Sequence, residues 1–212
     1  MRVHIGSDHA GFELKTHLLA HLASLGHEVL DIGPAAYDPQ DDYPPYCIAT
    51  AVAVLADPGS LGIVIGGSGN GEQIAANKVK GVRAILAWST ETARLGREHN
   101  NANVISVGGR MHSEEEATGF IDTFLATDYS GEARHTRRID MLSAYESTGR
   151  CRPPPEWADH SGPWNHLSSP YEESCLKVTP CTDWRATSGT RSAAARSRRP
   201  VRRAGSSTAP RC

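Results

Sequence analysis

Residues 66–78, GGSGNGEQIAANK, combine a glycine-rich turn with an acidic side chain, Glu72, and are the residues best suited to chemistry. Four glycines in six residues allow main-chain N–H groups to face a ligand, and N–H groups at the start of a helix favour anions. A carboxylate beside them is suited to removing a proton from carbon next to a carbonyl, while the N–H groups stabilise the enediolate. A simpler interpretation stays open: a tight turn without a ligand, with Glu72 complementing the helix dipole.

Two familiar nucleotide-binding motifs do not fit this segment. A phosphate-binding P-loop needs Lys-Ser or Lys-Thr after its last glycine, and neither pair follows here. The dinucleotide fingerprint G-x-G-x-x-G would need a third glycine at the position of Glu72. Ser68, within the loop, could pass a proton between two adjacent substrate oxygens, or it could only cap the helix that follows.

Further polar residues flank the predicted strands. Asp8 and His9 follow the first strand, Arg110 comes after the last strand, and His99 with Asn100 precedes the last strand. His99 is a candidate proton donor near neutral pH, although Asn100 beside it is also typical of a helix end. Arg110 is a candidate contact for an anionic ligand, whereas His9 could equally be an ordinary loop residue.

A basic segment, RHTRR at 134–138, follows the last predicted strand. Arg134 and Arg138 are four residues apart and share one helical face, with His135 three residues before Arg138. Two guanidinium groups on one face suit bidentate capture of a phosphate, and a solvated basic face is an equally good interpretation. A helix in this position could reach a neighbouring subunit rather than its own sheet.

Short apolar runs alternate with amphipathic stretches through residues 1–149, which predicts strands alternating with helices. The predicted strands are 3–5, 29–32, 61–65, 83–87 and 104–107, and the predicted helices run from about 14 to 25, 44 to 57, 70 to 78, 91 to 98, 113 to 126 and 135 to 145. The run at 61–65 has no polar side chain, as in parallel strands covered on both faces. The sequence therefore predicts an α/β domain with an open, five-stranded parallel sheet.

Ligands of open parallel sheets bind beyond the carboxyl ends of the strands, because the loops there converge on one edge. Asp8, His9 and the glycine-rich loop follow strands and are expected at this edge, as is Arg110. The hypothesis adds His99 and Asn100 to the same site, although they come just before a strand.

Composition divides the chain near residue 150. Residues 1–149 carry 11 Lys and Arg against 19 Asp and Glu, whereas residues 150–212 carry 11 against five and hold eight of the 13 prolines. The acidic first part argues against nucleic acid as the main partner. Residues 150–212 are expected to form a low-complexity, disordered tail, whose basic end at 191–207 is either solvated or binds polyanions weakly.

Cysteine use and hydropathy indicate a soluble, cytoplasmic protein. Only Cys47 lies in the first 149 residues, and the chain has no C-x-x-C pair, so neither a disulfide nor a zinc site is expected there. No apolar run reaches the length of a membrane span, and the first residues lack the long apolar stretch of a signal peptide. No membrane partner is expected.

Several longer motifs together resemble the type B ribose-5-phosphate isomerases. They are SDHAGFELK at 7–15, DDYPPYC at 41–47, GGSGNGEQIAANK, REHNNANVISVGGR at 97–110 and RHTRRI at 134–139, and in order they cover residues 1 to about 147. The resemblance implies a Rossmann-like αβα sandwich that forms a homodimer, with two active sites at the subunit interface and no metal or organic cofactor. It also implies interconversion of ribose 5-phosphate and ribulose 5-phosphate through a cis-enediolate, a step of the pentose phosphate pathway.

The same resemblance assigns roles to individual residues. Glu72 matches the base that abstracts the proton, and His99 matches the group that assists opening of the sugar ring. The implied contacts with the substrate are Asp8, His9, Gly67, Ser68, Gly69, Asn70, Gly71, Asn100, Arg110, Arg134, His135 and Arg138. Among these, 67–71 form the anion hole, and Arg134 and Arg138 of the partner subunit bind the phosphate.

The sequence departs from the pattern of many family members at Ser68. Many family members carry cysteine at this position and use it as the second catalytic group, so a cysteine-based scheme does not transfer to this chain. Ser68 together with Glu72 resembles the actinobacterial branch, in which the glutamate is the base. Two alternatives stay open, namely an isomerase of allose 6-phosphate or galactose 6-phosphate, and a non-enzymatic nucleotide-binding module that would bind ATP.

Overall fold

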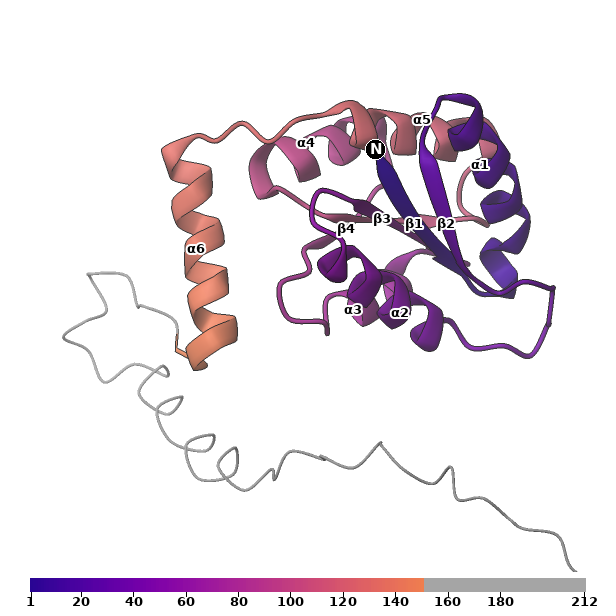
Figure 1. The fold of residues 1–212 in the computed structure, drawn as a ribbon, viewed down its shortest axis with the longest axis horizontal. Helices are drawn as coiled ribbons and strands as arrows, with labels where there is room; N and C mark the ends of the chain where they lie inside the picture. Colours follow the sequence, from indigo (N-terminus) through magenta and orange to yellow (C-terminus); the bar gives the residue numbers. More distant parts are fainter. Residues whose placement is uncertain (151–212) are drawn as a thin grey trace, which may run out of the picture. The chain divides into compact units, whose positions relative to one another are not determined.

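The computed structural model describes residues 1–150, and the rest of the predicted tail, 151–212, lies outside the described part. Five strands form one parallel sheet in the order β2-β1-β3-β5-β4 (Figure 1). They are β1 (Arg2–Ser7), β2 (Glu28–Gly33), β3 (Leu61–Gly66), β4 (Ala84–Leu86) and β5 (Val104–Gly108). The parallel sheet confirms the predicted α/β class, and the domain boundary at residue 149 stays a prediction.

Helices cover both faces of the sheet (Figure 1). One face carries α1 (Phe12–Ser24), α4 (Thr90–Asn100) and α5 (Glu114–Ala126), and the other carries α2 (Tyr43–Ala56) and α3 (Asn70–Ala76). Side chains alternate between the two faces, so Ile63 joins the first core and Val64 joins the second. The central strand β3 is buried over its whole length because both of its faces are covered.

A buried lysine on α1 connects this helix to the end of β2. Lys15 is 2% exposed, and its Nζ donates to both carboxylate oxygens of Asp31, at 2.7 and 2.6 Å, and to the carbonyl of Pro34 at 2.9 Å. Burying an ammonium group is costly unless such partners compensate for lost water. These bonds fix the start of loop 34–42, which leads to α2.

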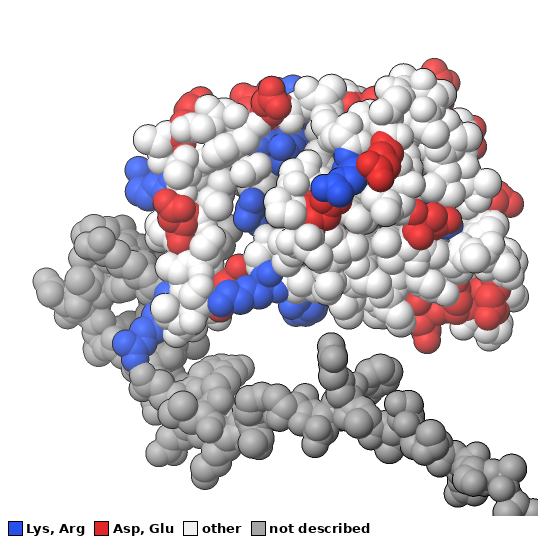
Figure 2. All heavy atoms as spheres, viewed as in Figure 1, with Lys and Arg blue, Asp and Glu red and all other residues white. Residues whose placement is uncertain are grey.

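The last helix, α6 (Ala133–Thr148), packs against α4 and has one buried side chain, that of His135. Three apolar side chains on it, those of Met141, Leu142 and Tyr145, are exposed. In the face drawn in Figure 2, Lys and Arg gather over α6 and the neighbouring part of the body, whereas Asp and Glu predominate farther from α6. The helix therefore presents a surface that is partly apolar and partly basic.

The strands and helices predicted from the sequence are present, with differences at their ends. β4 has three residues rather than five, and α3 ends two residues before Lys78. The helix stops there because the side-chain amide of Asn77 bonds the N–H and carbonyl of Ala84, at 2.8 and 2.9 Å. A short 3₁₀ helix at His9–Gly11, capped by Asp8, was not predicted. Within residues 1–150, no helix is long and apolar enough to cross a membrane.

Candidate active site

Glu72 lies at the carboxyl edge of the sheet, in the first turn of α3, directly after the loop that follows β3. Its side chain is 4% exposed, and its carboxylate lies so close to Gly66 that a Cβ atom on that residue would overlap it. Oε2 has no hydrogen-bond partner among the described residues. Because a buried oxygen without a partner is costly, this atom is placed to accept a proton or hydrogen bond from a ligand.

Burial raises the pKa of Glu72 above its ordinary value, and the negative charge of Asp8 nearby adds to this effect. Main-chain hydrogen bonds at Glu72 and Gly69 act in the opposite direction and lower the pKa. A carboxylate whose pKa is raised toward the working pH is a more effective general base than an exposed one. The environment of Glu72 therefore suits proton abstraction.

The loop after β3 is held in place by β5 and the residues after it. Ser106 Oγ donates to the carbonyl of Gly69 at 2.7 Å, and the N–H of Gly109 donates to the carbonyl of Gly66 at 2.8 Å. Gly69 has a φ of +81°, which favours glycine, and a Cβ there would contact Leu86. The path of the backbone therefore requires glycine at position 69, whether or not a ligand is bound.

Ser68 is exposed within this loop. Its Oγ accepts weak hydrogen bonds from the main-chain N–H and the side-chain amide of Asn70, at 3.4 and 3.3 Å. The N-cap residue of α3 is Gly69, which has no side-chain bond, so Ser68 gives the start of the helix only this weak hydrogen bond with the N–H of Asn70. Its hydroxyl proton is available to a ligand at the loop.

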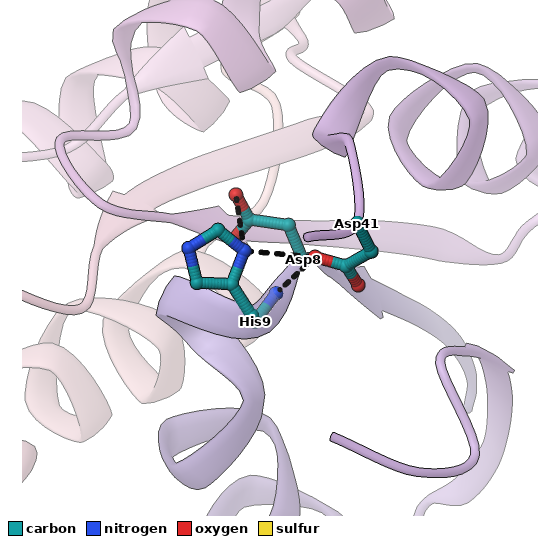
Figure 3. Close-up of side chains that lie close together, drawn as sticks. All are labelled: Asp8, His9 and Asp41. Carbon is teal, nitrogen blue, oxygen red and sulfur yellow. Dashed lines mark hydrogen bonds and ion pairs between the residues drawn. The ribbon is translucent and has the colours of Figure 1, made fainter. Parts of the chain in front are cut away.

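Asp8, His9 and Asp41 meet at the same edge of the sheet (Figure 3). The Oδ1 atom of Asp41 accepts hydrogen bonds from Nδ1 and from the main-chain N–H of His9, both at 2.8 Å. Asp8 Oδ1 accepts the N–H groups of Ala10 and Gly11, at 2.9 and 3.3 Å. A carboxylate on Nδ1 keeps the proton there and presents Nε2 of His9 to a ligand.

The same three side chains offer possible metal ligands within 4.8 Å of one another. Asp41 Oδ1 and His9 Nδ1 already bind each other, so a cation between them would have to displace the shared proton. The hydrogen bonds describe an imidazole oriented by a carboxylate. Freedom from metal stays a prediction, which a chelator tests.

Two side chains beside the loop had no role in the sequence-based hypothesis. Tyr43, the first residue of α2, lies against Gly71, where an added Cβ would be 2.7 Å from the tyrosine ring. Cys47 is completely buried, and burial raises the pKa of its thiol, as do the charges of Glu72 and Asp8. Cys47 is therefore a neutral thiol rather than a nucleophile. Both residues belong to the motif DDYPPYC, and this motif is the feature of the sequence that could have pointed to them.

Arg110 extends the site toward solvent. Its N–H donates to the carbonyl of Gly67 at 3.1 Å, and its guanidinium lies beside the same glycine. Together with His9 and Tyr37, it lines a cavity of about 330 Å³. An exposed arginine that lines a cavity is suited to bidentate binding of a phosphate or carboxylate.

His99 and Asn100 lie at the opposite edge of the sheet. They end α4, which returns to the start of β5, and the carbonyl of Asn100 accepts a hydrogen bond from Arg83, directly before β4. Glu72 follows the other end of β3, so about one strand length, roughly 17–20 Å, separates the two groups. Within one protomer, the structure does not bring His99 and Asn100 to the edge where they were expected.

The basic segment of α6 lies with His99 rather than with the glycine-rich loop. The ring of His135 is 4.2 Å from that of His99, and Arg134 pairs with Glu132 at 2.8 Å. The predicted residues thus form two groups. The carboxyl-edge group is Asp8, His9, Gly67, Ser68, Gly69, Asn70, Gly71, Glu72 and Arg110, and the α4–α6 group is His99, Asn100, Arg134, His135 and Arg138.

A buried carboxylate beside a glycine-rich loop, at the carboxyl edge of a parallel sheet, defines an α/β enzyme that moves protons on a small ligand. Residues 3–142 match the Ribose/Galactose Isomerase family, and the chain belongs to this family.

Two relatives and two solved structures illustrate the match. The chain is 59% identical over 155 residues to ribose-5-phosphate isomerase B of Mycolicibacterium paratuberculosis, covering 73% of this chain and 98% of the relative. It is 58% identical to the Mycobacterium tuberculosis protein of the same name, with 73% and 96% covered. The Mycoplasma genitalium enzyme with bound ribulose-5-phosphate is 40% identical with a TM-score of 0.67, covering 69% of this chain and 97% of that one. The Clostridium thermocellum structure is 37% identical with a TM-score of 0.68, covering 71% and 100%.

Proposed function

We propose that this protein interconverts D-ribose 5-phosphate and D-ribulose 5-phosphate through a cis-enediolate, as a step of the pentose phosphate pathway. The observation that carries the proposal is the buried carboxylate of Glu72 beside the glycine-rich loop. The names of the relatives and the ribulose-5-phosphate bound to the mycoplasma enzyme support this substrate. Phosphorylated sugars do not cross membranes freely, which supports a cytoplasmic location.

Glu72 removes the proton from carbon 2 of the open-chain aldose and returns it to carbon 1. The raised pKa of Glu72 supports this role, since the base must both take and release the proton. Main-chain N–H groups of 67–71 stabilise the enediolate oxygens, and Ser68 passes a proton between them. The hydrogens move only within the substrate and protein, so the reaction requires no redox cofactor.

Other residues bind the sugar and open its ring. Asp8 and His9 contact the sugar from the edge of β1, where hydrogen bonds from Asp41 fix the His9 ring. His99 assists ring opening, and Asn100 contacts the sugar beside it. Arg110, which lines the cavity and is exposed, contacts the phosphate, and Arg134 and Arg138 complete the phosphate site.

The division of these residues between two edges supports a homodimer with shared active sites. A two-fold axis perpendicular to the strands reverses their direction, so the α4–α6 group of one protomer would meet the carboxyl-edge group of the other. Exposed apolar side chains on α2, α3 and α6 provide a surface for this contact. They are Ile48, Val52, Leu55, Ile74, Met141, Leu142 and Tyr145.

The test is an isomerase assay with ribose 5-phosphate, with and without excess chelator, on the wild type and on Glu72→Gln. Glutamine preserves the size of the side chain but cannot take up the proton, so kcat should fall at least about 100-fold. Substrate affinity should change little, because the lost interaction belongs to the transition state. The chelator should leave the wild-type rate unchanged.

Glu91→Gln, which neutralises an exposed carboxylate on α4, is the matched control and should retain the wild-type rate. A near-normal rate for Glu72→Gln would refute the mechanism, and inactivation by the chelator would refute its independence of metal. Allose 6-phosphate in the same assay tests the six-carbon alternative. We expect much slower turnover than with the five-carbon sugar, in line with the names of the relatives.

A further inference from the structure

His135 differs from the other members of the basic segment because its side chain is buried. It is 3% exposed, and it is the one buried side chain of α6. Arg134 and Arg138, by contrast, are exposed and can reach a ligand. A ring enclosed in this way cannot contact a phosphate alongside them without leaving its place, so His135 needs a different role.

Ser130 holds the ring of His135 in place. Its Oγ lies 2.9 Å from Nδ1 of His135 and accepts the N–H of Glu132 at 3.3 Å. Because Oγ already accepts a hydrogen bond, its own proton is available for Nδ1. The N–H of Ser130 donates to the carbonyl of Glu98 at 3.0 Å, which ties this segment to the last turn of α4.

The ring of His135 lies against the ring of His99. The two centroids are 4.2 Å apart and the planes are inclined by 37°. The side chain of His99 is 36% exposed, and its Nε2 is 3.8 Å from a carboxylate oxygen of Glu98. One side of His99 is therefore fixed by packing, while its outer side faces solvent and an acidic neighbour.

The environment also sets the charge of His135. Burial lowers the pKa of its ring, and the neighbouring charges of His99, Arg134 and Arg138 lower it further, against an opposing effect of Glu132. His135 is therefore neutral at neutral pH. A neutral His135 places no second positive charge beside the ring of His99.

We propose that His135 is a positioning residue, which holds the ring of His99 in the orientation needed to open the ribofuranose ring. The inference rests on the function proposed above. In ring opening, the hydroxyl on carbon 1 gives its proton to Asp8 of the other protomer and the bond from carbon 1 to O4 breaks. O4 then takes a proton from His99. His135 touches none of these atoms and acts only through His99.

Ribulose 5-phosphate separates ring opening from the enolisation that follows it. The phosphate occupies O5, so this ketose has no hydroxyl that can close a five-membered ring on carbon 2, and it enters the site in the open form. Glu72 can then exchange a proton on carbon 1 for deuterium in D₂O, which NMR detects. Ribose 5-phosphate, in contrast, must open its ring before it reacts.

The experiment measures both reactions for the wild type, His135→Ala and Ser130→Ala. His17→Ala, a partly exposed histidine on α1 outside the site, is the matched control. Conversion of ribose 5-phosphate by His135→Ala should lose about 10- to 100-fold in kcat, the typical effect of a misplaced catalytic group, with KM unchanged. Ser130→Ala should lose less, and deuterium exchange into ribulose 5-phosphate should match the wild type in both variants.

A raised KM for both sugars would identify His135 as a phosphate contact and overturn the proposal, as would an unchanged kcat with ribose 5-phosphate. Thermal melts establish that His135→Ala is folded, and Ser130→Ala carries the test if it is not. His99→Ala is measured in parallel. If it abolishes deuterium exchange, the ring-opening role of His99 fails, whereas a wild type without either reaction would reject the isomerase function itself.

Discussion

Two inactive variants, Glu72→Gln and His99→Asn, should restore activity when they are combined in one dimer. The strands between these residues span roughly 17–20 Å, whereas proton transfer requires contact at about 3 Å. One protomer therefore cannot bring both groups to a single five-carbon sugar. The function proposed above therefore takes Glu72 from one subunit and His99 from the other at each site.

The expected activity follows from two-fold symmetry. A heterodimer of the two variants has one site that contains both substitutions and one site that contains neither. The purified heterodimer should have about half of the wild-type specific activity, and a randomly reassembled mixture about one quarter, because only half of its dimers are mixed. The Glu72→Gln parent, which lacks the base, should be at least about 100-fold less active than the wild type.

Subunits carrying different affinity tags are coexpressed, purified over both tags in series and assayed with ribose 5-phosphate. The control pairs Glu72→Gln with Arg110→Ala at substrate concentrations below KM. Because both residues belong to the carboxyl-edge group, each site of that heterodimer carries one substitution and activity should not return. A Glu72→Gln and His99→Asn heterodimer no more active than its parents would refute the shared site.

Four further predictions concern single substitutions and pH. Gly66→Ala should lower kcat at least about 10-fold while the protein stays folded, because the added Cβ would displace the Glu72 carboxylate. A normal kcat with an unchanged melting temperature would contradict this prediction. The raised pKa of Glu72 predicts that kcat/KM is lost on acidification with a midpoint above the ordinary glutamate value of about 4.3, and a profile flat down to that pH would exclude Glu72 as the base. The carboxyl group of Glu72 ionises at lower pH in the unfolded chain than in the native protein, so the stability of the fold should decrease as the pH rises from the unfolded to the native pKa. At neutral pH, Glu72→Gln should therefore melt at a higher temperature than the wild type. Arg138→Ala should raise KM about 10-fold or more with little change in kcat, since a hydrogen bond to a charged group contributes about 1.5–3 kcal/mol. The control is Arg137→Ala, which removes a neighbouring exposed arginine. Equal KM values for the two variants would remove Arg138 from the phosphate site.

The sheet and the carboxyl-edge group were predictable from sequence for a simple reason. Continuous apolar runs such as 61–65 mark buried parallel strands, and the carboxyl ends of parallel strands share one edge. Asp8, Glu72 and Arg110 each follow a strand, so their common location required no knowledge of side-chain packing. The same rule, applied strictly, would also have placed His99 at the other edge, because it precedes β5.

Other features depended on contacts between distant parts of the chain. The bonds between His9 and Asp41 join residues 32 positions apart, and nothing local in the sequence specifies them. The burial of His135 within an otherwise exposed basic helix arises from Ser130 and from the end of α4. Periodicity identifies which residues share a helical face, but it does not identify which of them a neighbouring element will cover.

The ammonium of Lys15 has a consequence for how loop 34–42 responds to salt. Mobile ions weaken charge pairs that they can surround, such as Arg94 with Glu91 on the outside of α4, where both side chains are at least 40% exposed. They cannot surround a cation that is 98% enclosed, even though its partner Asp31 is partly open to water. Concentrated electrolyte should therefore loosen the outer surface of this protein before it releases loop 34–42 and the carboxylate that orients His9.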